Sequence, residues 1–348
     1  MKKLVTFLLS LSMILSLSAC GEKTVNTGTT NEKGSETTEE QEKPEKEITV
    51  AGVVFQEDQF MKLLSLGYQD AAKDANVKCL TGNTANDQAK EAELINTYVA
   101  QKVDGLAISP LNKDSSFATL KIANDKGMKI AITNLPLTNA EFVVGGFTSD
   151  NVNLGATSGK AAAEFIKNEL GGKAKIAILQ FKSQLPEQSA DRVNGFLDEV
   201  KKVNPDVEVV ADQDAWLQDT AVASAGDILT AHPDVNIFYA ANDGGTIGAT
   251  MAVKNAGKAG ECFVFGIDVG DQQLAMLKDE SNILQAVTGQ DPYAIGYRAM
   301  ELLIKNLKGE DTSASEGKAV IVDGILVSRD NPEGIAKFEE DLKAKTGK

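Results

Sequence analysis

Residues 48–80 read ITVAGVVFQEDQFMKLLSLGYQDAAKDANVKCL. The stretch starts with a short apolar run from Ile48 to Val54 and continues with apolar residues at helical spacing from Phe60 to Ala75. It then returns to a second apolar run, Val77 to Leu80. A strand, a helix and a second strand in this order make a βαβ unit, in which the two strands lie parallel in one sheet. The stretch therefore predicts an α/β fold.

The same alternation continues to the end of the chain. Amphipathic helices are predicted at residues 85–101, 153–169, 190–202, 244–255 and 292–307. About ten strands exceed one comfortable doubly wound sheet, so we expect two lobes with parallel sheets flanked by helices. Further strands are predicted at residues 105–109, 129–133, 141–147, 175–181, 207–211, 236–240, 262–267 and 283–288.

The composition excludes several classes of function. The 348 residues include 35 Lys and Arg, 50 Asp and Glu and one His, for a net charge of −15. A nucleic-acid partner needs a basic face, so the charge argues against one. One histidine leaves few routes to His-based nucleophilic or zinc catalysis. Gly155 to Lys160 is one residue short of a phosphate-binding loop, and we interpret it as the start of a helix that contains glycine.

The first residues have the pattern of an export signal. Lys2 and Lys3 precede an apolar run from Leu4 to Leu17, which is too short to span a bilayer comfortably. Leu17-Ser18-Ala19-Cys20 resembles the bacterial lipobox, in which the cysteine is lipidated and becomes the mature N-terminus. We therefore expect a signal peptide at residues 1–19, a lipid anchor on Cys20 and a polar tether over residues 20–47. The alternative is a plain secretory signal.

The two remaining cysteines lie in different predicted strands. Cys79 lies in the second apolar run, and Cys262 precedes Phe263-Val264-Phe265. An exported chain could join them in a disulfide, but we expect two separate thiols because the strands belong to different parts of the fold.

Polar side chains follow most of the predicted strands. Ligands of open α/β sheets bind beyond the carboxyl ends of the strands, so these positions are the candidates for a site. Planar amides and carboxylates suit sugar hydroxyls, which both donate and accept hydrogen bonds, and aromatic rings suit the apolar faces of sugars. Any single residue could instead be a helix cap. The strand ends offer Gln56 to Phe60, Asn134, Gln184, Glu187, Gln188, Arg192, Asp214, Trp216, Asn242, Asp243, Asp268 and Gln290.

Residues 48–348 resemble a type 1 periplasmic binding protein of the pentose/hexose group, related to ribose- and glucose/galactose-binding proteins. The resemblance rests on the order and spacing of short motifs. These are Glu57-Asp58-Gln59-Phe60-Met61, residues 105–110, Thr148-Ser149-Asp150-Asn151, residues 190–196, residues 230–234, Ala241-Asn242-Asp243 and residues 264–268.

The resemblance implies two Rossmann-like lobes that are joined by three crossovers, near residues 149–152, 289–292 and 322–325. The two lobes would close on a sugar in the cleft between them. The N-terminal lobe would comprise residues 48–150 and 291–322, and the C-terminal lobe residues 152–289 and 325–348. Phe60 and Trp216 match the two aromatic residues that sandwich the sugar ring. The matching polar contacts are Asp58, Asn134, Arg192, Asn242, Asp268 and Gln290, with Gln56, Glu187 and Gln188 as further candidates.

The resemblance also implies the partners. We expect a monomeric binding lipoprotein on the extracytoplasmic face of the membrane, held by its lipid anchor only, that delivers a monosaccharide to the permease of an ABC importer. It would need no cofactor and no metal. Leu135 and Ala190 replace arginines of ribose binders, and residues 183–188 lack the His and Asp of glucose/galactose binders. The ligand therefore stays open among pentoses, hexoses and autoinducer-2.

Two other functions remain as alternatives. A receptor protein of the same fold would present a sugar or autoinducer-2 to a chemoreceptor or a sensor kinase. A hydrolase or isomerase would use carboxylates such as Asp58, Glu187 or Asp268 at working distance from one another.

Overall fold

The computed structural model describes residues 47–346. The predicted signal peptide, Cys20 and the tether up to residue 46 lie outside the described residues. The described chain forms two six-stranded sheets flanked by helices, which confirms the predicted fold class. The first sheet contains β1 (Thr49–Val54), β2 (Lys78–Asn83), β3 (Gly105–Ile108), β4 (Lys129–Thr133), β5 (Gly145–Thr148) and β11 (Ala319–Ile321). The second contains β6 (Lys175–Gln180), β7 (Glu208–Asp214), β8 (Ile237–Ala240), β9 (Phe263–Ile267), β10 (Leu284–Gly289) and β12 (Ile325–Ser328).

The two sheets repeat one topology. Their strand orders are β11-β5-β4-β3-β1-β2 and β12-β10-β9-β8-β6-β7, so each strand of the first sheet has a counterpart in the second. The pairings are parallel except that β12 runs antiparallel to β10. Because β1 to β5 all run in one direction, their carboxyl ends meet at one edge of the first sheet, and β6 to β10 do the same in the second.

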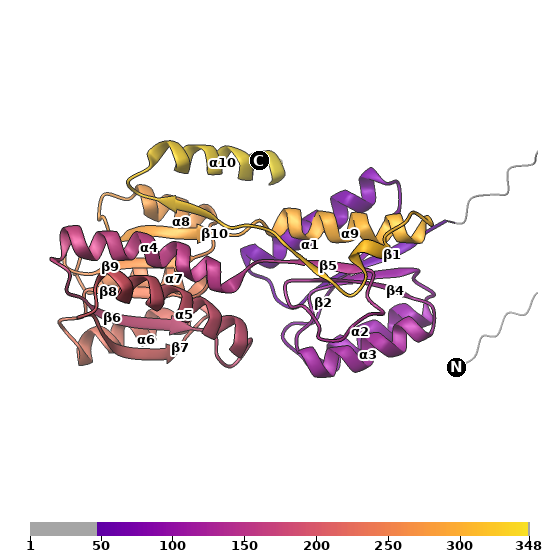
Figure 1. Cartoon of the computed structure of the whole chain (residues 1–348), viewed down its shortest axis with the longest axis horizontal. Helices are drawn as coiled ribbons and strands as arrows, with labels where there is room; N and C mark the ends of the chain where they lie inside the picture. Colours follow the sequence, from indigo (N-terminus) through magenta and orange to yellow (C-terminus); the bar gives the residue numbers. More distant parts are fainter. Residues whose placement is uncertain (1–46, 347–348) are drawn as a thin grey trace, which may run out of the picture. The chain divides into compact units, whose positions relative to one another are not determined.

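Helices cover both sheets (Figure 1). In the first half, α1 (Gln59–Asp74) packs on α9 (Pro292–Leu307), and α2 (Gln88–Ala100) packs on α3 (Lys113–Asp125). In the second half, α4 (Asn151–Glu169) packs on α5 (Pro186–Val203), and α6 (Gln218–Ala231) packs on α7 (Asp243–Asn255). The short α8 (Asp271–Lys278) contacts β10, and α10 (Pro332–Thr346) contacts β12. The chain passes from one sheet to the other after β5, after β10 and between β11 and β12.

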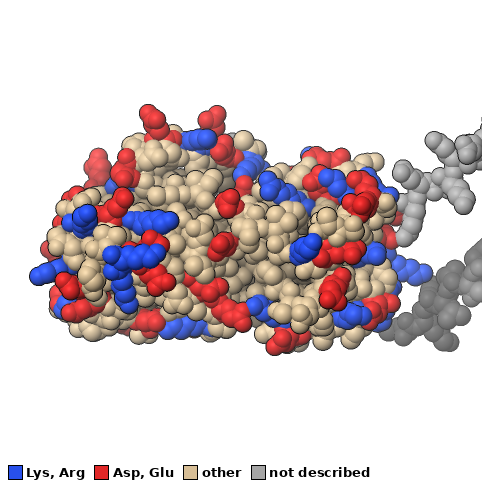
Figure 2. Space-filling model, in the orientation of Figure 1, with Lys and Arg blue, Asp and Glu red and all other residues tan. Residues whose placement is uncertain are grey.

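The apolar strand runs of the sequence form the core. Leu106, Ile108 and Ile130 of the first sheet and Ile176 and Phe238 of the second are fully buried. Burial of such side chains supplies most of the driving force for folding. Among the described residues, no helix combines the length and the apolar composition that a membrane crossing requires. The face drawn in Figure 2 carries Lys and Arg intermingled with Asp and Glu, as expected for a solvated surface.

Several element boundaries predicted from the sequence are wrong. The predicted strand over residues 141–147 forms a strand only from Gly145, whereas β2 and β7 extend three residues beyond their predicted ends. The predicted helix over residues 190–202 begins already at Pro186. The short strands β11 and β12 were not predicted at all.

Gly155 to Lys160 lies inside α4 and not at its start. A Cβ on Gly155 would lie 1.9 Å from the carbonyl oxygen of Arg192, and one on Gly195 would lie 2.1 Å from that of Val152. Glycine is therefore required here because the backbones of α4 and α5 touch. The motif serves helix packing.

Cys79 and Cys262 are separate free thiols, as predicted. Burial raises the pKa of Cys79 to about 11 and that of Cys262 to about 12, so both stay protonated at neutral pH.

Candidate functional site

The carboxyl ends of both sheets contribute to one small cavity, here called the inner chamber. Nine of the predicted site residues line it: Gln56, Asp58, Phe60, Asn134, Gln188, Arg192, Asn242, Asp268 and Gln290. Each follows the end of a strand or lies in the first turns of the helix after it. The sequence prediction therefore located residues that are far apart in the chain and close together in space. The volume of the inner chamber is about 50 Å³.

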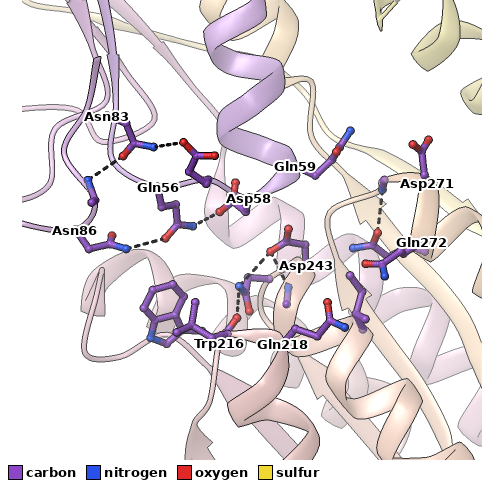
Figure 3. Close-up of a pocket in the computed structure, with 18 residues that line it drawn as sticks. Gln56, Asp58, Gln59, Asn83, Asn86, Trp216, Gln218, Asp243, Asp271 and Gln272 are labelled. Atoms are coloured by element: carbon purple, nitrogen blue, oxygen red, sulfur yellow. Dashed lines mark hydrogen bonds between the residues drawn. The ribbon is translucent and has the colours of Figure 1, made fainter. Parts of the chain in front are cut away.

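A wider cavity of about 690 Å³, here called the outer chamber, adjoins the inner one. Gln56, Asp58, Asn242 and Asp243 line both. Figure 3 shows Gln56, Asn83 and Asn86 on one side of the outer chamber and Trp216 and Gln218 on the other. Trp216 lines the outer chamber, whereas Phe60 lines the inner chamber, so the two predicted aromatic residues line different cavities.

Glu187 lies outside both chambers. It forms an ion pair with Lys113 of α3, and its side chain is 71% exposed. The pair borders a third cavity of about 680 Å³, which shares Gln184, Leu185 and Gln188 with the inner chamber. Glu187 is thus a contact between the two halves of the molecule and does not line the inner chamber.

Asp58 begins α1 and also faces both chambers. Its Oδ1 accepts a hydrogen bond of 2.7 Å from the Met61 amide, as an N-cap does, and its Oδ2 accepts one from the Gln56 amide. Burial raises the pKa of Asp58 and outweighs both hydrogen bonds. A carboxylate has about four lone-pair positions, so the cap leaves Asp58 able to accept bonds from a ligand.

Asp268 is the centre of a buried polar network on the second sheet. Gln290 Nε2 donates to its Oδ1 at 2.6 Å, and the backbone amide of Asp243 donates to its Oδ2 at 3.1 Å. The nearest guanidinium nitrogen of Arg192 lies 4.0 Å from Oδ2. Burial nevertheless raises the pKa of Asp268, because it outweighs the lowering by Arg192 and the hydrogen bonds.

The position of Arg192 is fixed from several sides. Its Nε donates to Asn151 Oδ1 at 2.9 Å and its NH1 donates to the Ala241 carbonyl at 2.8 Å. Its guanidinium carbon lies 5.1 Å from the centroid of the Phe181 ring. Its backbone packs against Gly155 of α4. The glycine contact between α4 and α5 therefore places the cation of the inner chamber.

Asn134 and Asp268 hold a left-handed backbone, with φ of 63° and 71°. Residues other than glycine adopt this conformation at a cost, and it recurs at functional positions. Asn134 follows β4 and Asp268 follows β9, which are counterparts in the two sheets. The Asn134 amide donates to the Phe147 carbonyl, and the Asp268 amide donates to the Thr288 carbonyl. Each sheet thus presents one such residue to the inner chamber.

Asn242 begins α7 and is largely engaged within the protein. Its Nδ2 donates to the Trp216 carbonyl at 2.9 Å and to Asp243 Oδ1 at 3.3 Å, and its Oδ1 accepts from the Gly245 amide at 3.2 Å. It therefore joins the two chambers by fixing Trp216 beside Asp243.

The resemblance did not assign a ligand contact to Asp243, Phe181 or Gln184, although all three line the inner chamber. Asp243 and Gln184 follow strands in the sequence, which was the available signal. Burial, together with the charges of Asp58 and Asp268, raises the pKa of Asp243 to about 8. Asn83 and Asn86 of the outer chamber were missed because the predicted strand ended at Leu80 and the next helix was predicted to begin before Asn86.

The side chains of the inner chamber are suited to hydrogen bonding with hydroxyl groups. Carboxylates, amides and one guanidinium converge there from both sheets, with Phe60 and Phe181 as apolar walls. Among residues 47–346, no group of three or more His, Cys, Asp or Glu side chains is arranged to hold a metal ion.

Comparison with known proteins agrees with this geometry. A sequence family described as periplasmic binding protein domain matches residues 49–311. The chain is 29% identical over 314 residues to the ribose import binding protein of Bacillus subtilis, which covers 89% of this chain and 95% of that protein. It is 27% identical over 303 residues to the Escherichia coli protein called ABC transporter periplasmic-binding protein YphF, covering 81% and 91%.

Among solved structures, the carbohydrate transporter solute-binding protein of Agrobacterium radiobacter, in complex with D-arabinose, superposes with a TM-score of 0.74. The two chains are 25% identical, and the match covers 84% of this chain and 98% of that one.

Proposed function

Because the chain belongs to the periplasmic binding protein family, type 1, in the pentose/hexose group, we propose that it is the substrate-binding component of an ABC sugar importer. It captures a monosaccharide and passes it to a permease without chemical change. The observation that carries this proposal is the inner chamber, where carboxylates, amides and a guanidinium from the two sheets converge on one space.

The two sheets contribute separate parts of the site. Asp58 and Asn134 come from the first sheet, and Arg192, Asp268 and Gln290 come from the second. A sugar that bonds both sets is bound more tightly when the halves are together, so it shifts the molecule toward a closed form. We take the moving lobes to be residues 48–150 with 291–322 and residues 152–289 with 325–348.

The two halves contact each other through side chains. Gln188 Nε2 donates to the Asn134 carbonyl at 2.8 Å, and Gln184 Nε2 donates to Gln56 Oε1 at 3.0 Å. Hydroxyl groups of a sugar replace such bonds at little net cost, since a hydrogen bond contributes only about 0.5–1.5 kcal/mol when partners are exchanged. These contacts lie at the border of the inner chamber, where a sugar would compete with them.

The proposal includes export and a lipid anchor on Cys20, which lies outside the described residues. The protein would act as a monomer on the extracytoplasmic face, attached through the lipid alone. In membrane fractionation, the wild type should sediment with membranes and Cys20→Ala should be released. Retention of Cys20→Ala in the membrane fraction contradicts the anchor and leaves the sugar-binding proposal standing.

Calorimetric titration of the purified protein with pentoses, hexoses and autoinducer-2 tests the binding function. We expect one or a few monosaccharides to bind. Asp58→Ala should weaken that affinity about ten- to a hundredfold, because it removes charge-assisted hydrogen bonds. Glu187→Ala is the matched control and should bind almost normally, since Glu187 pairs with Lys113 outside the chamber. The absence of binding by any sugar, in a folded protein, would refute the proposal.

A further inference from the structure

Gln184 of the second half forms a bridge to the first half. Its Nε2 donates to Gln56 Oε1 at 3.0 Å and to Asn86 Oδ1 at 2.9 Å. Asn86 Nδ2 in turn donates to Gln56 Oε1 at 3.3 Å, so the two partners of Gln184 are also joined to each other (Figure 3). Three side-chain amides thus form one closed set of hydrogen bonds between the halves, here called the amide bridge.

The turn that carries Gln184 is held firmly on the second half. The backbone amides of Gln184 and Leu185 both donate to the Phe181 carbonyl at 3.2 Å, and the side chain of Leu185 is buried. Ser189 Oγ accepts from the Phe181 amide at 3.1 Å, which ties the turn to α5. Pro186 stands at the start of α5, where its ring fixes the backbone. Gln184 therefore reaches the first half from a defined backbone position.

The loop that carries Asn86 is equally well defined on the first half. The Asn86 amide donates to the Phe55 carbonyl at 2.7 Å, and the Ala85 amide donates to Asn83 Oδ1 at 2.8 Å. Ala85 and Asn86 both have a left-handed backbone, with φ of 52° and 59°. Residues other than glycine adopt this conformation at a cost, which persists where the surrounding structure enforces it. Two constrained loops, one from each half, thus meet at the amide bridge.

The amide bridge stands where the three cavities of the cleft meet. Gln56 lines the inner and outer chambers, Gln184 lines the inner chamber and the third cavity, and Asn86 lines the outer chamber. Beside the bridge, Gln188 Nε2 donates to the Asn134 carbonyl at 2.8 Å. With these contacts formed, the inner chamber measures about 50 Å³. That is room for one or two water molecules, at about 30 Å³ each, and not for a sugar ring.

A sugar ring in the inner chamber and the amide bridge therefore exclude each other. A ring that bonds Asp58 needs more room than the bridge leaves, so Gln184 has to release Gln56 and Asn86 before the ring enters. The hydrogen bonds that Gln184 gives up then count against the binding of the sugar. A site that is accessible in only a fraction of the molecules binds with an affinity that is reduced by that fraction.

We propose that Gln184 sets the sugar affinity as a latch: its amide bridge holds the two halves together in a form that excludes the sugar, and the sugar binds only by displacing the bridge. This inference rests on the proposed function and adds a step to it. The contacts of the latch belong to the protein alone, so the latch can also be measured without a sugar.

Calorimetric titration with D-ribose, D-allose, D-glucose and D-galactose tests the latch, together with small-angle X-ray scattering of the protein in sugar-free buffer. Gln184→Ala should bind the preferred sugar about three- to tenfold more tightly than the wild type, the factor expected for one or two exchanged hydrogen bonds. Its radius of gyration without sugar should be larger, because the halves are no longer latched. The control Gln69→Ala removes an exposed amide that bonds Ser65 of its own helix, and should change neither quantity.

A second variant, on the first half, protects the test against a local defect in the turn before α5. Asn86→Ala should also tighten sugar binding, and its effect should fall below about twofold in the Gln184→Ala background, because both substitutions remove the same bond. Full additivity would overturn the latch.

The affinity of Gln184→Ala separates the latch from a direct contact with the sugar. A weaker affinity would show that Gln184 bonds the ligand, and an unchanged affinity would show that the bridge costs nothing; either result overturns the latch and leaves the proposed function intact. If none of the four sugars binds the wild type, the proposed function fails and scattering alone decides on the latch. An unchanged radius of gyration in both variants would then overturn it as well.

Discussion

Arg192→Met is expected to destabilise the protein strongly, although the proposed role of Arg192 is to contact the ligand. The substitution keeps much of the side-chain length and removes the charge. It deprives the Ala241 carbonyl and Asn151 Oδ1 of their donors at 2.8 and 2.9 Å. It also removes the cation that lies 4.0 Å from Asp268. Breaking a buried pair on one side costs about 3–5 kcal/mol, because an uncompensated charge stays buried. We therefore expect the free energy of unfolding to fall by about 3–5 kcal/mol.

The loss should also depend on pH. Asp268 has a raised pKa even beside Arg192, because burial dominates. Removing Arg192 removes a lowering influence, so the pKa of Asp268 should rise further. The folded protein then keeps a proton that the unfolded chain releases near pH 4. Stability is retained below that pH and is lost as pH rises toward the folded pKa. The cost of Arg192→Met should accordingly be smaller at pH 4 than at pH 7.

Denaturant unfolding followed by circular dichroism measures both effects, and a double-mutant cycle with Asp268→Asn isolates the charge pair. Without the carboxylate, Arg192→Met should cost at least about 1 kcal/mol less, because contacting residues in one network are not additive. Strict additivity, or a total loss below about 1 kcal/mol at pH 7, would show that Arg192 does not compensate Asp268.

Three further substitutions separate stability from binding. The pKa of Asp243 is raised to about 8, so the protein should lose stability as pH rises from about 4 to 8, and Asp243→Asn should reduce that loss. The control Asp227→Asn, at an exposed position, should show the same loss as the wild type. Equal dependence of the unfolding free energy on pH in both variants would refute this. Gly155→Ala should lower the free energy of unfolding by about 1–3 kcal/mol, because the new Cβ clashes with α5. Gly226 is a helical glycine with open space around it, so Gly226→Ala should leave the free energy of unfolding unchanged or raise it. Equal melting temperatures of the two variants would contradict this. Asn134→Gly should change the free energy of unfolding by less than about 1 kcal/mol, because glycine readily adopts the left-handed backbone of this position. The same substitution should weaken sugar affinity about tenfold in calorimetry. An unchanged affinity would show that the ligand does not contact Asn134.

The duplicated sheet architecture could be predicted from the sequence because its strands are short, apolar and separated by helices. The site residues followed from the same pattern, since each polar position after a strand falls at the carboxyl edge of a sheet. Asn134, Asp268 and Gln290 are such positions, and the structure places all three in the inner chamber. This reasoning needs no knowledge of side-chain contacts.

Other features depend on information that a local pattern does not contain. The helix α5 begins at Pro186, and its N-cap Leu185 makes no side-chain cap, so no capping residue marks the boundary. Glu187 and Gln188 therefore resemble loop residues, whereas both lie in the first turn of α5. There Gln188 and Arg192 share one face at a spacing of four residues, and Glu187 points to Lys113. The short strands β11 and β12 were not predicted because each forms only by pairing with a strand distant in the sequence, β11 with β5 and β12 with β10.

The division between the two chambers follows from where each aromatic residue stands relative to its sheet. Phe60 lies in the first turn of α1, after the inner strand β1, and so enters the inner chamber. Trp216 follows β7, the strand at the edge of the second sheet, and is fixed by Asn242 at the end of β8. A residue that follows an edge strand lies farther from the inner chamber than one that follows a central strand, because the inner chamber is lined mainly by residues that follow central strands. The two aromatic residues that the resemblance places on one sugar ring therefore line different cavities, and closure of the lobes would have to bring Trp216 toward Phe60.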